Sequence, residues 1–418
     1  VKQKGHTNIL IEGNYVKNAG NDAICVMYAY QPLVQYNISD GAGQDLDDNY
    51  EGYWQSFCAA IWPWKTKQAV FQYNEAFDTV GPGNGDGQAW DIDWSDSTVY
   101  QYNYSHGNGG GAMLVCLEQA YNGYFRYNIS QNDLKSFVTL QGNPNAHFYN
   151  NVFYVDGDLQ TAVHHPEAGK RSGSAEFKNN IFYNASSQKW LVGDHEAQQT
   201  WRPAGEQQVF DSNLYFGYDG TGQGLDTTGD AQKVTQDPKL VNPGSAPEAL
   251  LQNMATHFEG EGAIEQYFGG YKLQDGSPAI NAGVPVYVPE FLYNFQGVGG
   301  KDAVKVTDFF GNPIGDQPDI GVFESNTPED EVNLNVTSGT YMVETDAIRE
   351  IPADTTVETF LANIRYSSKA QVKVMRAEQE ISGQELLKEG DILRVSKIGE
   401  EQTMKDYTLY MAPILYDR

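Results

Sequence analysis

A short asparagine-centred motif recurs along the first half of the chain, and it restricts the possible folds more than any other feature. In each copy, aromatic or apolar residues precede an asparagine and further apolar residues follow it. The last asparagine of each copy is Asn14, Asn37, Asn74, Asn103, Asn128, Asn151, Asn180 or Asn213. Successive copies are 23, 37, 29, 25, 23, 29 and 33 residues apart. A minimum spacing near 23 residues, with some longer spacings, is typical of a solenoid whose insertions are confined to loops.

Residues around each asparagine alternate as they do in strands, and no long segment has the 3.6-residue period of a helix. This pattern favours a parallel β-helix over helical repeats. The spacing of leucine-rich repeats is missing, and the hairpin turns of propeller blades are not evident. We expect the equivalent asparagines to stack as a hydrogen-bonded ladder at a turn, where asparagine also tolerates left-handed backbone. The 43 glycines suit a fold with many corners.

Three later segments resemble the terminal coils of secreted bacterial right-handed β-helix enzymes. They are residues 237–240, 273–283 and 308–324. We therefore expect an all-β chain in which residues 1–324 form a right-handed parallel β-helix, truncated at its N-terminal end, as the catalytic domain. Residues 325–331 are predicted to be a linker, and residues 332–418 to be a small C-terminal β-rich domain.

The small domain is expected to contain short strands and one helix. The strands are predicted at residues 332–336, 371–375 and 392–395, and the helix at residues 356–361. This part resembles small β-rich modules appended to extracellular bacterial enzymes. Its sequence has no aromatic stripe and no metal-binding pattern, which favours a spacer or docking role over carbohydrate binding.

Charge excludes several classes of partner. The chain has 55 acidic and 27 basic residues, a formal charge of −28. Nucleic acid is not expected, because phosphate binding needs clustered lysine and arginine. An anionic membrane surface or a strongly acidic polymer is disfavoured for the same reason. The 27 tyrosines and 7 tryptophans suit a sugar ligand, whose apolar ring faces stack on aromatic side chains.

Cysteines and hydropathy restrict the class further. Cys25, Cys58 and Cys116 are odd in number and lie among apolar neighbours, so buried free thiols are expected. No apolar run approaches the ~20 residues that a membrane-spanning helix needs. The first residues are polar and lack the pattern of a signal peptide.

Three carboxylates lie within eight residues in the segment 85–94, Gly-Asp-Gly-Gln-Ala-Trp-Asp-Ile-Asp-Trp. On a strand, Asp91 and Asp93 point to one face. The opposite face is then expected to hold Trp90, Ile92 and Trp94. Asp86 directly follows a glycine-rich stretch, residues 81–85, that is predicted to be a turn.

Two carboxyl groups in unlike surroundings are the minimum equipment for glycoside hydrolysis, and the retaining reaction places them ≈ 5–5.5 Å apart. Asp86 and Asp93 cannot be so close along one straight strand, which rises ~3.3 Å per residue. The glycines permit Asp86 to fold back over Asp93. Plainer alternatives stay open, because Asp86 can cap a turn and Asp91 with Asp93 can be solvated or bind calcium.

The motif at residues 85–93, with Tyr-Asn-Tyr-Ser-His-Gly-Asn-Gly-Gly-Gly at residues 102–111, resembles the catalytic coil of lacto-N-biosidases of glycoside hydrolase family 136. Those β-helix enzymes release lacto-N-biose (Gal-β1,3-GlcNAc) from lacto-N-tetraose, a human-milk oligosaccharide, with retention. The family's catalytic pair is two aspartates seven positions apart, which match Asp86 and Asp93. The resemblance covers residues 8–324 and implies that Asp86 is the acid/base and Asp93 the nucleophile, with no cofactor required.

Other residues near this motif are candidates for substrate binding. Asp91 is expected to orient Asp93 or a sugar hydroxyl, and Gln88 belongs to the same motif. Trp90 is equally suited to the core or to a subsite floor. Aromatic residues of the longest insertion, Trp54, Trp62 and Trp64, are expected either to form sugar-binding walls or to pack in the loop.

Histidines are weaker candidates. His106, in the next coil, is a substrate-binding candidate whose alternative is a turn histidine. His164, His165 and His195 lack ligand spacing, so no catalytic metal is predicted, although a structural calcium ion is possible.

The family's catalytic region is preceded by further coils and by a helical part that assists folding, which some members carry as a separate polypeptide. The chain instead starts at Val1 close to a strand-like run, residues 9–11. We therefore expect an N-terminal companion chain to complete the open end of the solenoid. The resemblance also implies an extracellular or cell-surface bacterial location.

Two other functions compete with the hydrolase. A β-helix polysaccharide lyase would need a lysine or arginine base and a uronate substrate, yet residues 78–117 carry only acidic charges among Asp, Glu, Lys and Arg. A non-catalytic surface adhesin would use the aspartates for calcium and the aromatic residues for glycan.

Overall fold

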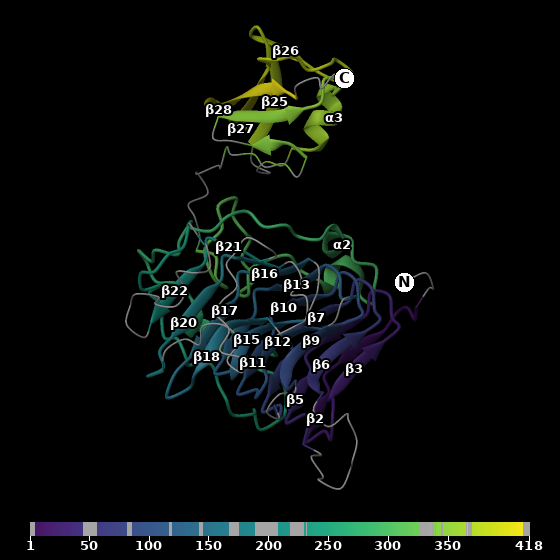
Figure 1. Ribbon diagram of the computed structural model, residues 1–418, viewed down its shortest axis with the longest axis vertical. Helices are drawn as coiled ribbons and strands as arrows, with labels where there is room; N and C mark the ends of the chain where they lie inside the picture. The colour runs from purple at the N-terminus through teal and green to yellow at the C-terminus, as the bar shows by residue number, and fades with distance from the viewer. Residues whose placement is uncertain are drawn as a thin grey trace. The chain divides into compact units, whose positions relative to one another are not determined.

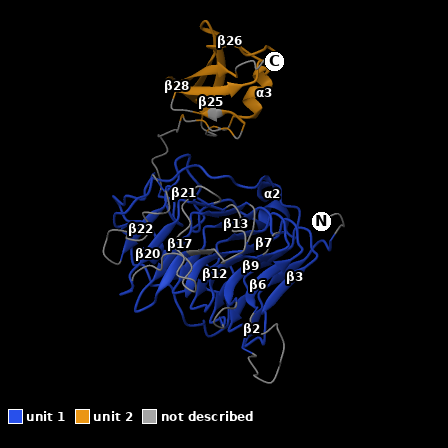
Figure 2. Cartoon of the chain, viewed as in Figure 1, with its two compact units in different colours: residues 1–325 blue, residues 326–418 orange. Residues whose placement is uncertain are grey.

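The computed structural model describes most of the chain, with gaps between the following ranges. Described are residues 5–44, 57–81, 86–116, 119–141, 145–166, 175–188, 208–217, 230, 232–325, 334, 336, 338, 340–343, 346–364, 366 and 370–412. The chain divides into two compact units, residues 1–325 and 326–418 (Figure 2).

The first unit is a parallel β-helix, as predicted, in which each full coil contributes one short strand to each of three parallel sheets (Figure 1). The first sheet contains β1 (Leu10–Glu12), β4 (Leu33–Gln35), β7 (Val70–Gln72), β10 (Val99–Gln101), β13 (Gly123–Arg126), β16 (Ala146–Tyr149), β19 (Ala175–Lys178) and β21 (Gln208–Asp211). The second contains β2 (Tyr15–Lys17), β5 (Ile38–Asp40), β8 (Glu75–Phe77), β11 (Tyr104–His106), β14 (Ile129–Gln131), β17 (Val152–Val155), β20 (Ile181–Asn184) and β22 (Leu214–Gly217). The third contains β3 (Ile24–Met27), β6 (Ala59–Trp64), β9 (Gln88–Asp93), β12 (Gly111–Cys116), β15 (Lys135–Leu140) and β18 (Thr161–Pro166).

The predicted asparagine ladder is present at the corner between the first and second sheets. Each ladder asparagine donates its Nδ2–H to the Oδ1 of the asparagine in the next coil, over 2.8–3.1 Å. The same Oδ1 accepts the backbone N–H of the previous coil's asparagine at 2.9–3.1 Å. The described ladder ends at Asp230, whose carboxylate accepts the last pair of bonds from Asn213.

The left-handed backbone lies one residue earlier than expected. The residue preceding each ladder asparagine has φ between 49° and 66°, and in four coils it is a tyrosine: Tyr36, Tyr73, Tyr102 and Tyr127. Left-handed backbone is costly for a residue with a Cβ and persists only where its surroundings impose it. The asparagine bonds on either side of the corner supply that constraint.

The interior of the coils is apolar and rich in aromatic residues. Rings stack between successive coils, as between Phe148 and Phe177 at 4.7 Å and between Phe177 and Phe210 at 4.6 Å. All three belong to one continuous buried cluster that runs through the solenoid. Inward residues of consecutive coils therefore stabilise one another in register.

Residues 232–325 do not form the terminal coils that the sequence predicted. In place of repeating strands they contain α1 (Ala263–Phe268), η1 (Gly269–Tyr271), α2 (Glu290–Tyr293) and η2 (Gly300–Ala303). This segment, here called the flank, packs its own aromatic and aliphatic residues on the outer faces of the first two sheets. Its contacts reach from Gln31 in an early coil to Asn179 in a late one. Apolar residues spaced without strand alternation explain why it covers the coils and does not extend them.

The second unit is a small mixed sheet with one helix. Its strands, in spatial order, are β23 (Met342–Val343), β24 (Ala347–Ile351), β28 (Glu400–Met411), β27 (Ile392–Lys397), β25 (Ala370–Arg376) and β26 (Gln379–Ile381). Thr356 caps α3 (Val357–Ala362) by accepting the Thr359 N–H, close to where the sequence predicted a helix. The strands predicted at residues 371–375 and 392–395 correspond to β25 and β27, whereas most of residues 332–336 falls outside the described part. Within that part of the chain, none of the helices has the length and apolar character needed to cross a membrane.

Removal of one central ladder side chain is expected to destabilise the solenoid strongly. In Asn103→Ala, the Asn74 amide groups lose their acceptor, while Phe71 O and Asn128 Oδ1 lose a donor. Since unpaired buried polar groups cost ~1–3 kcal/mol each, we expect a loss of about 3–5 kcal/mol. Denaturant unfolding should show this loss of stability. The control is Asn14→Ala, at the exposed first rung, which should lose about 1 kcal/mol. Equal losses in the two variants would contradict the ladder as a main source of stability.

Candidate active site

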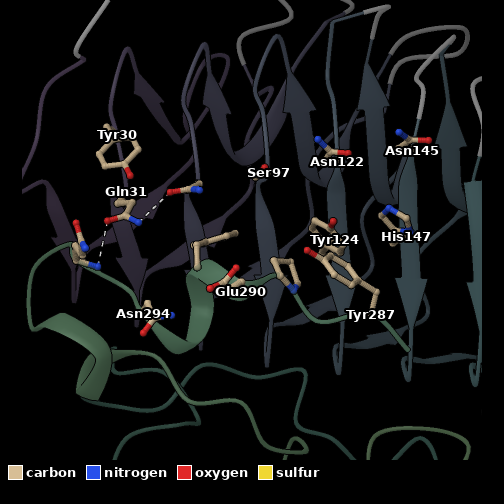
Figure 3. A pocket seen from close by; sticks show the side chains of 14 residues that line it. Tyr30, Gln31, Ser97, Asn122, Tyr124, Asn145, His147, Tyr287, Glu290 and Asn294 are labelled. Carbon is tan, nitrogen blue, oxygen red and sulfur yellow. Dashed lines mark hydrogen bonds between the residues drawn. The ribbon is translucent and has the colours of Figure 1, made fainter. Parts of the chain in front are cut away.

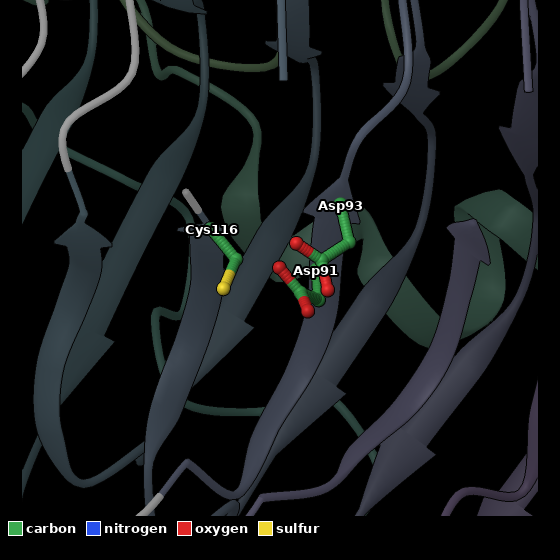
Figure 4. A group of neighbouring side chains, drawn as sticks. All are labelled: Asp91, Asp93 and Cys116. Atoms are coloured by element: carbon green, nitrogen blue, oxygen red, sulfur yellow. The ribbon is translucent and has the colours of Figure 1, made fainter. Parts of the chain in front are cut away.

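The acidic motif lies on the outer face of the third sheet, where β9 is flanked by β6 and β12. Strand alternation is observed as predicted for its centre: Trp90 and Ile92 belong to the interior cluster. Asp91 and Asp93 therefore share the outward face. Oxygen atoms of both carboxyl groups and Cys116 Sγ lie within 4.8 Å of one another (Figure 4).

Glycine backbones pack tightly where the chain approaches β9. Gly87 has φ 110° and donates its N–H to Cys58 O, while Gly110 donates to Gly87 O. A Cβ on Gly110 would lie 2.6 Å from Asp86 O, and one on Gly87 would lie 2.4 Å from Gly81 Cα. Only glycine fits both positions. The half-buried Asp86 is thereby held at the start of β9, and its charge raises the pKa of Asp91.

The two strand carboxyls hold protons more strongly than exposed aspartates do. Burial, reinforced by the charges of Asp93 and Asp86, raises the pKa of Asp91 well above its usual value of 3.8. Burial and the charge of Asp22 raise the pKa of Asp93 to about 6, against a lowering contribution from Cys116. Both shifts favour the protonated form, and a pKa of about 6 leaves Asp93 mostly ionised at neutral pH.

Cys25 and Cys116 lie near these two carboxyls, Cys58 lies near Asp22 and Asp86, and none of the three forms a disulfide. Burial with nearby aspartate charges raises the pKa of Cys25 and of Cys116, and raises that of Cys58 to about 12. The thiols are therefore neutral, and they add weakly polar walls that keep the carboxyls poorly solvated. Cys116 Sγ lies 3.2 Å from Gln141 Oε1, which it contacts as a donor.

Aromatic residues border the carboxyls on the β6 side. The register pairs Trp64 with Asp93 and Ile61 with Trp90, which places Trp62 beside Asp91. Trp62 and Trp64 contact edge to face at 6.2 Å and are half-buried. Both predicted aromatic walls thus lie directly next to the acidic pair.

Trp94 does not lie on the interior face, contrary to the sequence prediction. β9 ends at Asp93, and Trp94 adopts a left-handed φ of 49°, which breaks the alternation. Its ring lies 5.8 Å from that of Trp64. Lys65 Nζ lies 5.1 Å from the Trp94 ring centre and 5.3 Å from that of Trp64.

Three predicted substrate-binding residues are buried in the fold. Trp90 was suited to the core or to a subsite floor, and its full burial in the interior cluster fits the core. Gln88 is almost fully buried at the first position of β9. His106 is in β11 of the second sheet, stacked on Phe77 at 4.7 Å, and burial lowers its pKa to about 4. It therefore lies in a packed neutral environment on a different sheet from the carboxyls.

Several buried polar atoms around the acidic pair have no hydrogen-bond partner among the described residues. They include one oxygen each of Asp91 and Asp93 and the indole N–H group of Trp94. Such groups are costly unless a ligand or water satisfies them. Acceptors and donors side by side match the hydroxyl groups of a sugar.

A calcium ion does not fit the described cluster. Calcium takes six to eight oxygen ligands, whereas Asp91, Asp93 and Cys116 offer two carboxyl groups and a neutral thiol. A structural calcium ion elsewhere in the chain stays a prediction.

Sequence reasoning missed Asp22, which is mostly buried and accepts the Ala59 N–H at 3.0 Å. It lies in the turn before β3 and raises the pKa of Asp93 from another coil. An aspartate just before a strand, as at Asp86, is a local signal for it, but only the stacking of coils brings them together. Trp54, residues 82–85 and His195 lie outside the described residues, and β18 contains His164 and His165.

Known proteins similar to this chain include lacto-N-biosidases. No protein-family profile matches the chain. A lacto-N-biosidase of Bifidobacterium longum subsp. longum is 36% identical over 398 residues, which cover 91% of this chain and 22% of that protein. Two crystal structures of a GH136 lacto-N-biosidase from Eubacterium ramulus are also similar, the native protein at 41% and its selenomethionine derivative at 39% identity. They cover 44% and 46% of this chain and 28% and 29% of theirs, each with a TM-score of 0.36.

Replacing Asp93 by asparagine is expected to stabilise the fold at neutral pH. Because folding raises the Asp93 pKa from 3.8 to about 6, its desolvation cost is fully present above pH 6 and absent below pH 3.8. At ~1.4 kcal/mol per pKa unit, Asp93→Asn should gain about 3 kcal/mol at pH 8. Denaturant unfolding at pH 8 and pH 4 should show that gain and its disappearance.

Asp96→Asn is the matched control with the opposite sign. Burial alone would raise the Asp96 pKa, but hydrogen bonds from Asn122 and Ser97 and the charge of Lys67 lower it overall. That variant should lose stability above pH 4. A gain in both variants, or a pH-independent gain in Asp93→Asn, would contradict the assigned pKa of Asp93.

Proposed function

The chain belongs to the lacto-N-biosidase family, glycoside hydrolase family 136, and we propose that it supplies the catalytic carboxyls of a retaining enzyme of that kind. It spans 22% of the length of the curated relative. The proposed reaction releases lacto-N-biose from lacto-N-tetraose-type oligosaccharides. The observation that carries the proposal is the place of Asp93 on the outward face of β9, next to Asp91 and beside Trp62 and Trp64, with Asp86 held at the start of the same strand.

In the proposed reaction, the ionised Asp93 attacks the anomeric carbon and forms a glycosyl ester. The glycosidic C–O bond breaks as Asp86 transfers its proton to the leaving oxygen. Asp86 then removes a proton from water, whose oxygen attacks the same carbon and releases Asp93. Two displacements return the original configuration at the anomeric carbon.

Asp86 is better suited than Asp91 to the acid/base role. The acid/base must give up its proton in the first step and accept another in the second. The raised pKa of Asp91 favours its protonated form, and its burial removes it from water. Asp86 is half-buried at the start of the strand, where water can reach it. Asp91 would instead orient Asp93 or a sugar hydroxyl through a hydrogen bond.

Lys65 does not by itself favour the lyase alternative. Its ammonium group is held over aromatic rings, where it is suited to contact a bound sugar. A 4,5-unsaturated uronate product would favour the lyase over the hydrolase, and glycan binding without any turnover would favour the adhesin.

The catalytic roles can be separated with an aryl β-lacto-N-bioside and lacto-N-tetraose, using the complete protein in which this sequence occurs. Asp86→Ala should lose ~10²–10⁴-fold in rate on the tetrasaccharide. Cleavage of the aryl substrate should be better preserved, because its leaving group needs no proton. Asp93→Ala should abolish turnover of both substrates.

Azide identifies each role by product configuration. Asp86→Ala with azide should give the β-glycosyl azide, and Asp93→Ala should give only the α-azide. Asp91→Asn, the control, should keep retaining turnover. Loss of all activity in Asp91→Asn with normal activity in Asp86→Asn would transfer the acid/base role to Asp91.

We also propose that an N-terminal companion polypeptide of the same enzyme covers the first coil. In the described residues, β1, β2 and β3 each pair with a strand on one side. Leu10 of β1 is 42% exposed, and Ile9, Ile11 and Ile24 are only partly buried against the interior cluster. Partly exposed apolar residues of this kind are suited to pack against a further polypeptide of the same enzyme.

Leu10→Glu is expected to weaken capture of that companion by at least about five-fold, measured by co-purification and native mass spectrometry. Val241→Glu is a matched control, since Val241 is 54% exposed but lies in the flank. A stable, fully active monomer of this chain alone would contradict the companion.

A further inference from the structure

A cleft of about 740 Å³ lies on a different side of the solenoid from the carboxyls (Figure 3). One wall is the corner where the chain leaves the third sheet and enters the first. The other wall is the part of the flank that carries α2. Ser97, on the first wall, is four residues beyond Asp93, so the cleft is one corner away from the catalytic face.

The corner wall is a regular column of polar side chains. Five successive coils each place one residue there, directly before a strand of the first sheet: Gln31, Gln68, Ser97, Asn122 and Asn145. All five have φ between 50° and 62°, so the same left-handed turn repeats in each coil. Adjacent strands are ~4.8 Å apart, and the column therefore extends ~19 Å along the solenoid. That length suits an extended chain of several units.

Aromatic rings form one end of the cleft. Tyr124 stacks on His147 with ring centres 4.7 Å apart and planes 11° apart. Tyr287, from the flank, lies 6.1 Å from Tyr124 and is 43% exposed. His147 Nδ1 is 3.0 Å from Glu176 Oε2 and 2.8 Å from Tyr149 Oη, which fixes its ring beneath Tyr124.

The flank wall is held in place by buried contacts. Leu292 and Phe295 pack with Leu33, Val70 and Val99 of the first sheet in one apolar cluster. The Gln296 N–H donates to Gln31 Oε1 at 3.1 Å. Glu290 and Asn294, on either side of this anchor, extend their polar groups toward the cleft (Figure 3). The cleft is thus formed before a ligand arrives, which lowers the cost of binding.

The chemistry of the lining selects a neutral sugar chain. Among the described residues that line the cleft, amides predominate, one carboxylate (Glu290) is present, and there is neither lysine nor arginine. Amides donate and accept together, as hydroxyl groups require, and exposed tyrosine rings offer faces for the apolar side of a pyranose. Phosphate and uronate ligands lack a counter-charge here, and the formal charge of −28 opposes them.

We propose that this cleft is a second, non-catalytic binding site for a neutral oligosaccharide. It would hold part of a glycan on the first sheet while another part, or another chain, reaches Asp93 around the corner. The proposal does not depend on the roles of Asp86 and Asp93. The ligand has two possible sources, the tetrasaccharide substrate itself or a different neutral glycan.

The test measures binding in the complete protein carrying Asp93→Asn, by calorimetry and saturation-transfer NMR. Lacto-N-tetraose and lacto-N-biose are the probes for the first source, and neutral tetrasaccharides of glucose or xylose are the probes for the second. Tyr287→Ala and Asn294→Ala should each lower the affinity of one class of binding site, the cleft, by about five- to ten-fold. In the protein with Asp93 intact, the same variants should leave kcat on the small aryl substrate unchanged.

Tyr293→Ala is the matched control, because Tyr293 is on α2 and 53% exposed but does not line the cleft. It should bind every probe as the parent does, and unfolding temperatures should agree among all three variants. The proposal is overturned if no probe distinguishes Tyr287→Ala from Tyr293→Ala. It is also overturned if all bound probe is lost with Trp64→Ala, since binding would then be confined to the catalytic face. Absence of hydrolysis would count against the catalytic proposal alone.

Discussion

Every coil of the first unit depends on one interaction, the side-chain ladder of asparagines at the corner between the first and second sheets. Each rung joins two coils through a side-chain bond and a backbone bond, and most rungs also donate to a backbone carbonyl of the preceding coil's strand in the first sheet. The ladder gives hydrogen-bond partners to the buried side-chain amides and backbone N–H groups of its own asparagines. It also maintains a left-handed residue beside each rung, so that tyrosines at these positions are tolerated. Because the rung sets where each coil turns, it also sets the register of all three sheets.

The candidate active site is a consequence of that register. Carboxyls on β9 receive Trp62 and Trp64 from the coil before and Cys116 from the coil after, since equivalent positions are stacked. Burial raises the pKa of both carboxyls. Retaining hydrolysis needs a nucleophilic carboxylate and a second carboxyl that exchanges a proton with the leaving group and with water, the roles proposed for Asp93 and Asp86. The fold therefore accepts a loss of stability on this face and compensates for it through the aromatic interior and the ladder.

The cleft on the first sheet follows from the same stacking. A left-handed turn repeated in five coils produces a polar column, and the flank closes it into a cleft. In a solenoid, one type of residue that recurs at the same position of each coil forms a linear surface, which suits a linear ligand. Each position within the coil repeats independently of the others. The outward face of the third sheet and the corner before the first sheet can therefore carry different surfaces.

How much could be predicted from the sequence differs between the coils, the flank and the site. The positions of all eight ladder asparagines were predictable, because a repeat reports its own period and its side chains bond to their own copies. The flank was predicted wrongly as further coils, since its turn motifs resemble coil corners and only its packing on the first two sheets shows that it returns along them. Trp94 was assigned to the wrong face because alternation ends where a strand ends, and that end is set by a corner shared with neighbouring coils.

The sequence by itself determined the repeat, the parallel solenoid and the nearness of Asp91 to Asp93 on one strand face. These properties are local or periodic, so they need no knowledge of distant contacts. Only the tertiary structure decided that Asp22, Cys25 and Cys116 from other coils lie near that pair, and that His106 belongs to a different sheet. It also decided that burial raises the pKa of both carboxyls. Burial and Coulomb interactions depend on which residues the stacked coils place in contact. Because the insertions between coils differ in length, those contacts cannot be read from positions along the sequence.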